Sequence, residues 1–406
     1  MFKTKLNADG TVQRYRARLV AKGFQMKEGI DYYESFSPVF SYPSFRMVMA
    51  RAAAMDMRVD QWDLKNAFLQ QRIDVDHLYM APPAGYSKTM ADGVTPAALH
   101  CKGSIYGMVQ SSRLLHVRLS RFLKANGYRQ LISDKCVFTK GVGDDEEIVC
   151  IYVDDIILAT KRGNEQKRFE FNKMFEKEFE MSPWTQGECD WILNINIQRD
   201  WEKGTIHLSQ EAAISKLARR FGLDNNKGSL LPMDPNVKFK KPDLSDVIPS
   251  TSFDYMSAIG GLLYISITTR PDIAYSVGVL SRFMSCPGEV HVSAAKKLIS
   301  YLYSTKTYGI RYSRSSGNES ASAPHRHDQP QGYYHAEKNK KGIIGSPVQS
   351  GDGATVSAYV DADLAGDQDT MRSTTGYVIM LYGGVISYSA KLQSTVALST
   401  AEAETN

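Results

Sequence analysis

Two short apolar runs near the middle of the chain enclose a pair of acidic residues. Residues 148–153 and 156–160 are rich in β-branched side chains, and each run has the length of a buried strand. Because only Asp154 and Asp155 lie between them, the pattern predicts a β-hairpin with two negative charges at its turn. These charges repel each other unless a cation binds, and aspartates that hold divalent metals are used in nucleotidyl transfer. A solvated turn is the alternative, because Asp is common in turns.

The pattern in the N-terminal half predicts an α+β order of elements. The predicted elements are a hairpin of strands 2–6 and 12–20 around Asn7-Ala8-Asp9-Gly10, a helix from Pro43 to about Met57, a strand over 59–64, and helices over 114–126 and 164–179. The strand over 59–64 carries Asp63 at its end, beside a sharp turn at 67–69. Asp63 is therefore a candidate site residue, although a helix N-cap explains it equally well. Asp63 and the Asp154–Asp155 pair lie on separate strands that can lie side by side.

The C-terminal half predicts helices first and a small sheet last. Helices are predicted over 210–221, 258–265, 273–283 and 292–303, and strands over 355–361, 376–381 and 385–389, before a helix near Ser399. Residues 315–352 lose apolar periodicity and are rich in Ser, Gly, His, Lys and Gln, which indicates a flexible linker. His325, His327 and His335 lie in this linker without a fourth partner at a zinc-site spacing, so a zinc site is not predicted.

Composition narrows the class of protein. The 406 residues are enough for two or three domains, and the net charge of +5 gains meaning from its distribution. Residues 1–30 hold Lys3, Lys5, Arg14, Arg16, Arg18, Lys22 and Lys27 against Asp9 and Glu28. Such a basic lobe suits a polyanion, or is a solvated surface. The five scattered cysteines, the lack of a membrane-length apolar run and the N-terminus Met-Phe-Lys-Thr-Lys predict an intracellular protein that is neither secreted nor in a membrane.

Several motifs in order resemble one known family. They are Arg16-Ala17-Arg18-Leu19-Val20-Ala21-Lys22-Gly23-Phe24, Trp62-Asp63-Leu64-Lys65-Asn66-Ala67-Phe68-Leu69, Ser104-Ile105-Tyr106-Gly107-Met108-Val109-Gln110 and Tyr152-Val153-Asp154-Asp155. Together they resemble the reverse transcriptase of copia-type LTR retrotransposons. Downstream, Arg270-Pro271-Asp272-Ile273-Ala274-Tyr275 resembles the connection region of that polyprotein, and residues 357–404 resemble the start of its RNase H.

The resemblance implies an α+β right-hand polymerase with fingers, palm and thumb, followed by a connection region and an incomplete RNase H-like α/β domain. The implied divisions are fingers, truncated at the N-terminus, and palm over 1–200, a helical thumb and connection region over 201–314, the linker over 315–352, and a truncated RNase H-like domain over 353–406. The implied partners are an RNA template, a DNA primer or RNA–DNA hybrid, and dNTPs, in a cytoplasmic particle or the nucleus. The sequence leaves the oligomeric state open.

The resemblance also assigns roles to single residues. It implies that Asp63, Asp154 and Asp155 are catalytic, and that Asp63, Asp154 and the backbone carbonyl of Leu64 hold two Mg²⁺ ions, or Mn²⁺ in their place. It implies that Phe68 rejects a ribose 2′-hydroxyl, although a core aromatic explains this residue equally well. In the same way Gln110 is expected to line the incoming nucleotide, and Arg18 or Lys22 to reach its phosphates.

The sequence departs from the family in several places, among them Asn194 where the family has Gly. After Gln110, Ser112 and Leu115 stand where the family usually has Pro and Trp, and the loss of a packed Trp costs a few kcal/mol unless neighbours fill the space. Of the four carboxylates expected for RNase H, the chain supplies Asp361 and Glu404 before it ends. We therefore expect a vestigial RNase H without activity, and poor local order from about residue 355 onward.

Three functions follow from these observations. The first is an RNA-directed DNA polymerase that joins a dNTP to the primer 3′-hydroxyl. The second is a degenerate retroelement fragment that binds nucleic acid without catalysis, because of the altered motif after Gln110 and the expected truncations. The third is a metal-dependent nucleotidyl transferase or cyclase that acts on free nucleotides, which template dependence would distinguish from the first. The motifs at 104–110 and 270–275 argue against the third.

Overall fold

The computed structural model describes residues 1–6, 11–83, 85–86, 89, 93–94, 97–182, 187–225, 228–249, 252–314, 348–349 and 355–405. The chain divides into two compact units. The first contains Met1–Ser41 and Arg58–Glu188, and the second contains Tyr42–Met57 and Cys189–Asn406. Helix α1 (Tyr42–Ala54) thus belongs to the second unit, although most of the first unit follows it in the chain.

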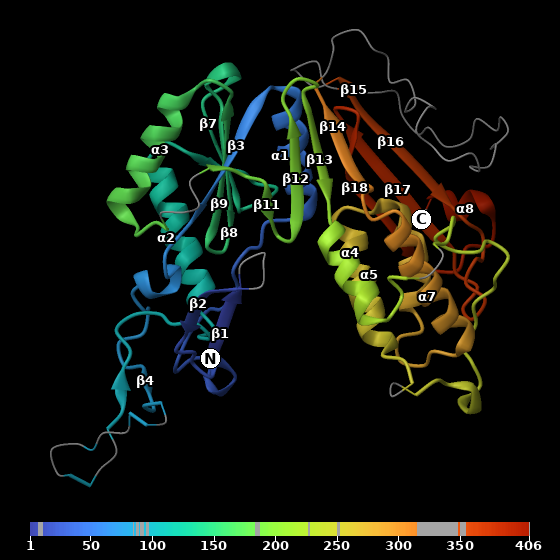
Figure 1. The fold of residues 1–406 in the computed structure, drawn as a ribbon, viewed down its shortest axis with the longest axis horizontal. Helices are drawn as coiled ribbons and strands as arrows, with labels where there is room; N and C mark the ends of the chain where they lie inside the picture. Colours follow the sequence, from blue (N-terminus) through green and yellow to red (C-terminus); the bar gives the residue numbers. More distant parts are fainter. Residues whose placement is uncertain are drawn as a thin grey trace. The chain divides into compact units, whose positions relative to one another are not determined.

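A six-stranded sheet forms the centre of the first unit. Its strands, in spatial order, are β10 (Gly187–Glu188), β3 (Met57–Asp63), β9 (Asp155–Lys161), β8 (Glu147–Tyr152), β7 (Val137–Lys140) and β6 (Arg129–Gln130). Figure 1 shows this sheet with helices α2 and α3 beside it. The predicted strand over 59–64 is confirmed as β3, and β3 lies next to β9. The two strands that carry the acidic residues are therefore neighbours, as the sequence pattern allows.

The predicted acidic hairpin is confirmed, but its turn is shifted by one residue. Tyr152 of β8 pairs with Asp155 of β9, so Val153 and Asp154 form the two-residue turn. The prediction that Asp154 and Asp155 make the turn is therefore wrong, because Asp155 begins β9. Val153 has a φ of 56°, in a left-handed region that β-branched residues rarely adopt. Backbone strain of this kind concentrates at functional sites, where the surrounding structure maintains it.

Helices α2 (Ser111–Ala125) and α3 (Glu165–Glu178) pack their apolar faces onto this sheet. Asn164 caps α3 by accepting a hydrogen bond from the Lys167 N–H, and Gly127, at a φ of 86°, follows the end of α2. The rings of Phe122 and Phe175 meet edge to face at 5.0 Å. The buried core contains Trp62, Leu64, Leu115, Leu119, Leu123, Phe138, Val149, Ile151, Ile156, Leu158, Phe171, Phe175 and Phe179. This core fixes the ends of β3 and β9.

The N-terminal part of the first unit contains two separate hairpins. Strands β1 (Phe2–Leu6) and β2 (Val12–Ala17) pair antiparallel as predicted, and their turn at 7–10 lies outside the described residues. The second pair is β4 (Tyr79–Met80) with β5 (Leu99–His100). Leu78, Cys101 and Met108 form a small core in this region.

The second unit contains the predicted helices, packed around one apolar core. They are α4 (Glu211–Arg220), α5 (Tyr255–Thr268), α6 (Ala274–Ser281) and α7 (Glu289–Ser304). A four-stranded antiparallel sheet also belongs to this unit, in the order β11 (Trp191–Ile192), β12 (Ile195–Asp200), β13 (Thr205–Ser209) and β14 (Gly309–Ser313).

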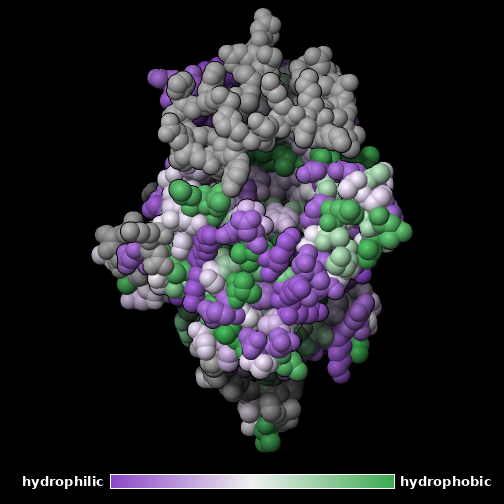
Figure 2. Space-filling view, turned by 90° about the vertical axis from the view of Figure 1, so that its right-hand side faces the viewer, coloured by the Kyte–Doolittle hydropathy of each residue, from purple (hydrophilic) through white to green (hydrophobic). Residues whose placement is uncertain are grey.

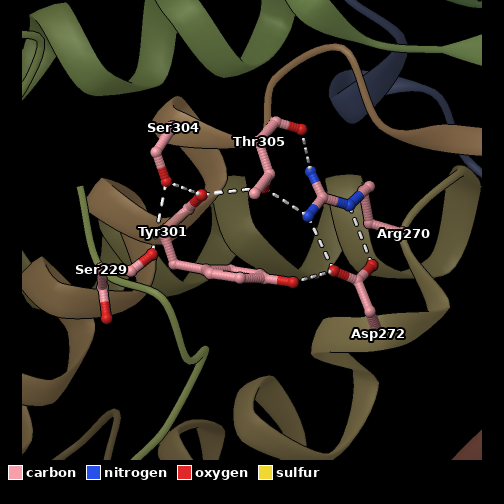
Figure 3. A network of polar contacts seen from close by, with 6 residues as sticks. All are labelled: Ser229, Arg270, Asp272, Tyr301, Ser304 and Thr305. Atoms are coloured by element: carbon pink, nitrogen blue, oxygen red, sulfur yellow. Dashed lines mark hydrogen bonds and ion pairs between the residues drawn. The ribbon is translucent and has the colours of Figure 1, made fainter. Parts of the chain in front are cut away.

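The Arg270-Pro271-Asp272 motif forms a buried polar network between α5 and α7. The Arg270 guanidinium donates to both carboxylate oxygens of Asp272, at 2.9 and 2.7 Å, and to the carbonyl and hydroxyl of Thr305 (Figure 3). The Tyr301 hydroxyl donates to the same carboxylate at 2.9 Å. Arg270 is 1% exposed, so each of these bonds satisfies a donor that has left water. The motif therefore has a structural role at the end of α7.

A second sheet of this unit contains the chain's last strands. Strands β15 (Val348–Gln349), β16 (Thr355–Ala362), β17 (Thr374–Leu381) and β18 (Gly384–Leu392) pair antiparallel in that order, and α8 (Thr400–Thr405) lies beside β16. The linker predicted at 315–352, with its three histidines, lies outside the described residues except for 348–349. The expected poor order from about residue 355 is wrong, because residues 355–405 form these regular elements.

One contact that holds this sheet comes from a buried arginine in a distant part of the chain. Arg46 of α1 is 3% exposed and donates to the carbonyl oxygens of Ile386 in β18 and of Ile267 and Thr268 in α5, at 2.8 to 3.0 Å. Its guanidinium also lies 4.6 Å from the centre of the Tyr388 ring. The C-terminal sheet is therefore fixed by contacts within the second unit.

The surface of the second unit is mixed in polarity. Figure 2 shows polar residues over most of the described surface on that side, with small groups of apolar residues among them. Such scattered apolar side chains are usual at protein surfaces. Within the described ranges, no helix is long and apolar enough to span a membrane.

Candidate active site

Three aspartates of the first unit come together where β3 and β9 begin or end. Asp63 is the last residue of β3, Asp154 lies in the hairpin turn and Asp155 is the first residue of β9. The Leu64 N–H donates to the Asp154 carbonyl at 3.2 Å, which ties the end of β3 to the turn. All three side chains are half-buried. The structure therefore places the residues predicted from two separate motifs at one point of the sheet.

The electrostatics of this cluster favour a positive charge. Burial, together with the nearby charges of Asp154 and Asp63, raises the pKa of Asp155 to about 6, although a hydrogen bond from Gln61 acts to lower it. The Gln61 Nε2 donates to Asp155 Oδ1 at 3.0 Å. Negative groups that disfavour one another's ionisation in this way are stabilised by a bound cation.

The oxygen atoms of the cluster fit a magnesium ion for which the protein supplies only some of the ligands. Among the described residues, no group of three or more His, Cys, Asp or Glu side chains is arranged to hold a metal by itself. Mg²⁺ is usually bound by one or two carboxylates together with water and substrate phosphates, so an all-protein cage is not required. Asp63, Asp154 and the Leu64 carbonyl are all oxygen ligands of the kind this ion prefers. The residues present therefore fit the ion expected from the sequence.

Two neutral residues that the sequence reasoning missed contact the cluster. Gln61 reaches Asp155, and the Ser182 hydroxyl donates to Asp63 Oδ2 at 2.9 Å. Gln61 is two residues before Asp63 on β3, so the period of a strand could have placed both on one face. The sequence held no comparable signal for Ser182, which is separated from Asp63 by 119 positions.

Contacts through the Tyr106 ring connect Arg18 to Phe68. The Arg18 guanidinium lies 4.6 Å from the centre of the Tyr106 ring, and the Tyr106 and Phe68 rings meet edge to face at 5.0 Å. The Ser104 hydroxyl donates to the Phe68 carbonyl at 2.6 Å. Phe68 is half-buried and Arg18 is exposed. Three of the motifs quoted from the sequence are thus in direct contact.

Two glycines allow this contact. A methyl group at Gly23 would collide with the Gly107 carbonyl, and one at Gly107 would collide with the Ala21 carbonyl. The Ala21 N–H donates to the Tyr106 carbonyl at 2.8 Å, so the two backbones lie directly against each other. Lys22, the other predicted phosphate contact, is exposed at this junction. The junction explains why both motifs contain glycine at these positions.

Gln110 lies inside the unit. It is 0% exposed, and its Nε2 donates to the Asp31 carbonyl at 3.0 Å. Within the described residues its Oε1 is buried without a hydrogen-bond partner. Nearby, Leu115 stands where the family has Trp and is 1% exposed in the core of α2 and the sheet. Neighbouring side chains therefore enclose this position.

The two residues expected for RNase H belong to different elements of the second unit. Asp361 lies in β16 and Glu404 in α8, and both are exposed. Within the described part of the chain, no hydrogen bond or ion pair joins them. In contrast, Asp367 is buried and accepts a hydrogen bond from Arg282 at 2.8 Å. At least one acidic residue of this region, Asp367, therefore stabilises the fold through its bond to an arginine.

Comparison with known proteins gives a family. Residues 1–235 match the family described as reverse transcriptase (RNA-dependent DNA polymerase). The whole chain is 33% identical to 27% of the Retrovirus-related Pol polyprotein from transposon TNT 1-94 of Nicotiana tabacum, and 32% identical to 24% of the corresponding polyprotein from transposon RE1 of Arabidopsis thaliana. A putative transposon Ty5-1 protein of Saccharomyces cerevisiae is 25% identical over 84% of this chain and 96% of its own length.

These matches agree with the motifs and with the site geometry. The chain spans about a quarter of the length of the two plant polyproteins. The family match includes Asp63, Asp154 and Asp155 together with the residues that contact them. Because that match covers more than half of the chain and the similarity to copia-type Pol polyproteins extends over all of it, the chain belongs to the reverse transcriptase (RNA-dependent DNA polymerase) family.

Proposed function

We propose that the aspartate cluster is the polymerisation site of an RNA-directed DNA polymerase. The observation that carries this proposal is the meeting of Asp63, Asp154 and Asp155 at the ends of two neighbouring strands, where burial and the neighbouring aspartates raise the pKa of Asp155. Asp63, Asp154 and the Leu64 carbonyl are the proposed ligands for two Mg²⁺ ions, and Mn²⁺ is the proposed substitute. When bound, these ions would activate the primer 3′-hydroxyl and stabilise the charge of the triphosphate and leaving pyrophosphate.

The chain's own residues supply binding and orientation in this proposal. Asp155 adds negative charge beside the proposed ligands, and Gln61 orients its carboxylate through the bond to Oδ1. Arg18 and Lys22 are exposed cations on the segment docked against Tyr106, where either can meet nucleotide phosphates. The proposed partners are an RNA template, a DNA primer or RNA–DNA hybrid, and dNTPs. In fold terms the central sheet is the proposed palm, the N-terminal hairpins the fingers, and the helices of the second unit the thumb and connection region.

Phe68 is the proposed residue that distinguishes dNTPs from rNTPs. Its ring is half-buried and held edge to face by Tyr106, and its backbone carbonyl is fixed by Ser104. A ring that packs against Tyr106 on an anchored backbone is hindered from moving aside for an additional hydroxyl group, so it would exclude a ribose 2′-hydroxyl by contact. Gln110 lies inside the unit, where its amide donates to the Asp31 carbonyl. Its proposed effect on the nucleotide is therefore indirect.

The test is primer extension on an RNA template, first in Mg²⁺ and then in Mn²⁺. We expect the wild-type chain to extend a DNA primer in a template-dependent manner. Asp154→Ala should abolish extension while leaving hybrid binding and the circular dichroism spectrum intact. Asp144→Ala is the matched control, because Asp144 is an exposed aspartate of the same unit that pairs with Lys161 at 3.1 Å. Folded wild-type protein that binds the hybrid without extending it would support the alternative, a fragment that binds nucleic acid without catalysis.

A further inference from the structure

The segment that follows α3 returns to the end of β3. Leu64 and Met181 form an antiparallel bridge, and the Ser182 N–H donates to the Asp63 carbonyl at 2.9 Å. Residues 180–182 therefore lie alongside residues 63–65 as a short added strand. The position of Ser182 is set by main-chain bonds and does not depend on its own side chain.

A glutamine side chain fixes the same segment from the other side. The Gln70 Nε2 donates to the Glu180 carbonyl at 3.0 Å, and the Glu180 N–H donates to Gln70 Oε1 at 2.9 Å. The Lys65 N–H also donates to the Glu180 carbonyl, at 2.9 Å. This reciprocal pair of amide bonds binds the segment in one register. Ser182 thus lies two residues after Glu180, whose backbone is fixed by these bonds.

The hydroxyl of Ser182 makes a second contact with Asp63. Its Oγ donates to Asp63 Oδ2 at 2.9 Å, so one residue engages both the backbone and the carboxylate of Asp63. Serine is a neutral donor, so this bond leaves the charge of the carboxylate in place. An arginine in this place would compensate that charge. The bond can therefore orient the carboxylate without making it less able to bind a cation.

We propose that Ser182 is a positioning residue that holds the Asp63 carboxylate, through its bond to Oδ2, in the orientation needed to bind a divalent cation. The inference rests on the proposed function, because it takes Asp63 as a metal ligand. Residues that hydrogen-bond to metal ligands typically change metal affinity about 10-fold to 100-fold when they are removed. The segment after α3 thereby contributes to the site, although it carries no residue of the polymerase motifs.

The test measures cation binding directly, by the electron paramagnetic resonance signal of free Mn²⁺ during titration of the full chain. Ser182→Ala should weaken Mn²⁺ binding about tenfold. Ser182→Thr keeps the hydroxyl and should restore most of the affinity. Ser120→Ala is the matched control, because Ser120 is a serine of the same unit whose hydroxyl pairs with His116 at 3.1 Å. Ser182→Ala should also raise the Mg²⁺ concentration for half-maximal primer extension, with a smaller effect on the rate at saturating Mg²⁺.

A double-mutant comparison separates the inference from the proposed function. Asp63→Asn should weaken Mn²⁺ binding by itself, and adding Ser182→Ala to it should have little further effect. If Asp63→Asn leaves Mn²⁺ binding unchanged, the proposed metal site is wrong. If Asp63→Asn weakens binding while Ser182→Ala matches the wild type in a protein of unchanged melting temperature, only the positioning role of Ser182 is overturned. Equal weakening by Ser182→Ala and Ser182→Thr would also contradict that role.

Discussion

Two groups of aspartates in this protein meet different partners. In the cluster of the first unit, neutral groups donate to two aspartates: Gln61 to Asp155 at 3.0 Å and Ser182 to Asp63 at 2.9 Å. In the second unit, guanidinium groups do so: Arg270 to Asp272 at 2.7 Å and Arg282 to Asp367 at 2.8 Å. The first arrangement orients carboxylates and leaves their charge uncompensated by these donors. The second compensates the charge and fixes the chain.

The pKa of Asp155 is raised and the pKa of Asp367 is lowered, because their partners differ. Burial raises the pKa of Asp155, and the neighbouring aspartates raise it further despite the bond from Gln61. Burial also acts to raise the pKa of Asp367, but the N–H groups of Thr370 and Asp369 and the Arg282 guanidinium outweigh it, so the pKa is lowered. At Asp367 the hydrogen-bond donors and the guanidinium outweigh burial, whereas at Asp155 the single bond from Gln61 does not.

The largest expected effect is the loss of a compensating arginine in the second unit. Arg270→Ala should lower the free energy of unfolding by about 3 kcal/mol, because it leaves Asp272 and Thr305 without their buried donor. Urea denaturation measures this. Arg220→Ala, which removes an exposed pair with Asp254 at 3.2 Å, is the control and should cost less than about 1 kcal/mol. Similar losses of unfolding free energy in both variants would contradict the stabilising role of Arg270.

A smaller effect with a defined pH dependence is expected at Asp367. Asp367→Asn should lower the free energy of unfolding at pH 7 by about 2 kcal/mol, because Arg282 loses a charged acceptor. The pKa of Asp367 is lowered in the folded state, so the wild-type advantage exists above the unfolded pKa and is lost as the pH falls through the folded pKa. Denaturation from pH 8 to pH 3 should therefore show the two proteins converging in acid. A difference independent of pH would show that the charge is not what matters.

The smallest effect has the opposite sign. Asp155→Asn should raise the free energy of unfolding at pH 7 in EDTA by about 1 kcal/mol, allowing for solvent screening. The pKa of Asp155 rises from 3.8 to about 6 on folding, so the wild type loses stability as the pH rises between these values, and the variant does not. Thermal unfolding at pH 4 and pH 7 measures this, with Asp144→Asn as the surface control. A variant that is less stable than the wild type at pH 7 would contradict the account.

Local pattern was enough to predict most elements of the fold. The acidic hairpin, the strand that ends at Asp63 and the helices of both units follow from apolar periodicity and turn residues, and the structure confirms them. The hairpin turn was misplaced by one residue because Val153 adopts a left-handed conformation that its residue type disfavours. The surrounding strands impose this conformation, and no local rule predicts it.

Contacts between residues that are distant in the chain could not be predicted from the sequence. Arg46 bonds to Ile386 of the C-terminal sheet across 340 positions, and the sequence predicted it only as part of a helix. Ser182 and Gln61 were missed for a related reason, since their importance comes from which carboxylate they face. The motifs located Asp63, Asp154 and Asp155, but only the fold shows what holds them.

The most direct test of the central claim is the Mn²⁺ binding isotherm of the wild type beside those of Asp154→Asn and Asp144→Asn, without nucleic acid. The claim is that the aspartates at the ends of β3 and β9 form a cation site, in which neutral donors orient Asp63 and Asp155. We predict that Asp154→Asn weakens Mn²⁺ binding at least tenfold, as expected for the loss of a charged ligand, and that Asp144→Asn binds as the wild type does. Identical isotherms for all three proteins would contradict the claim.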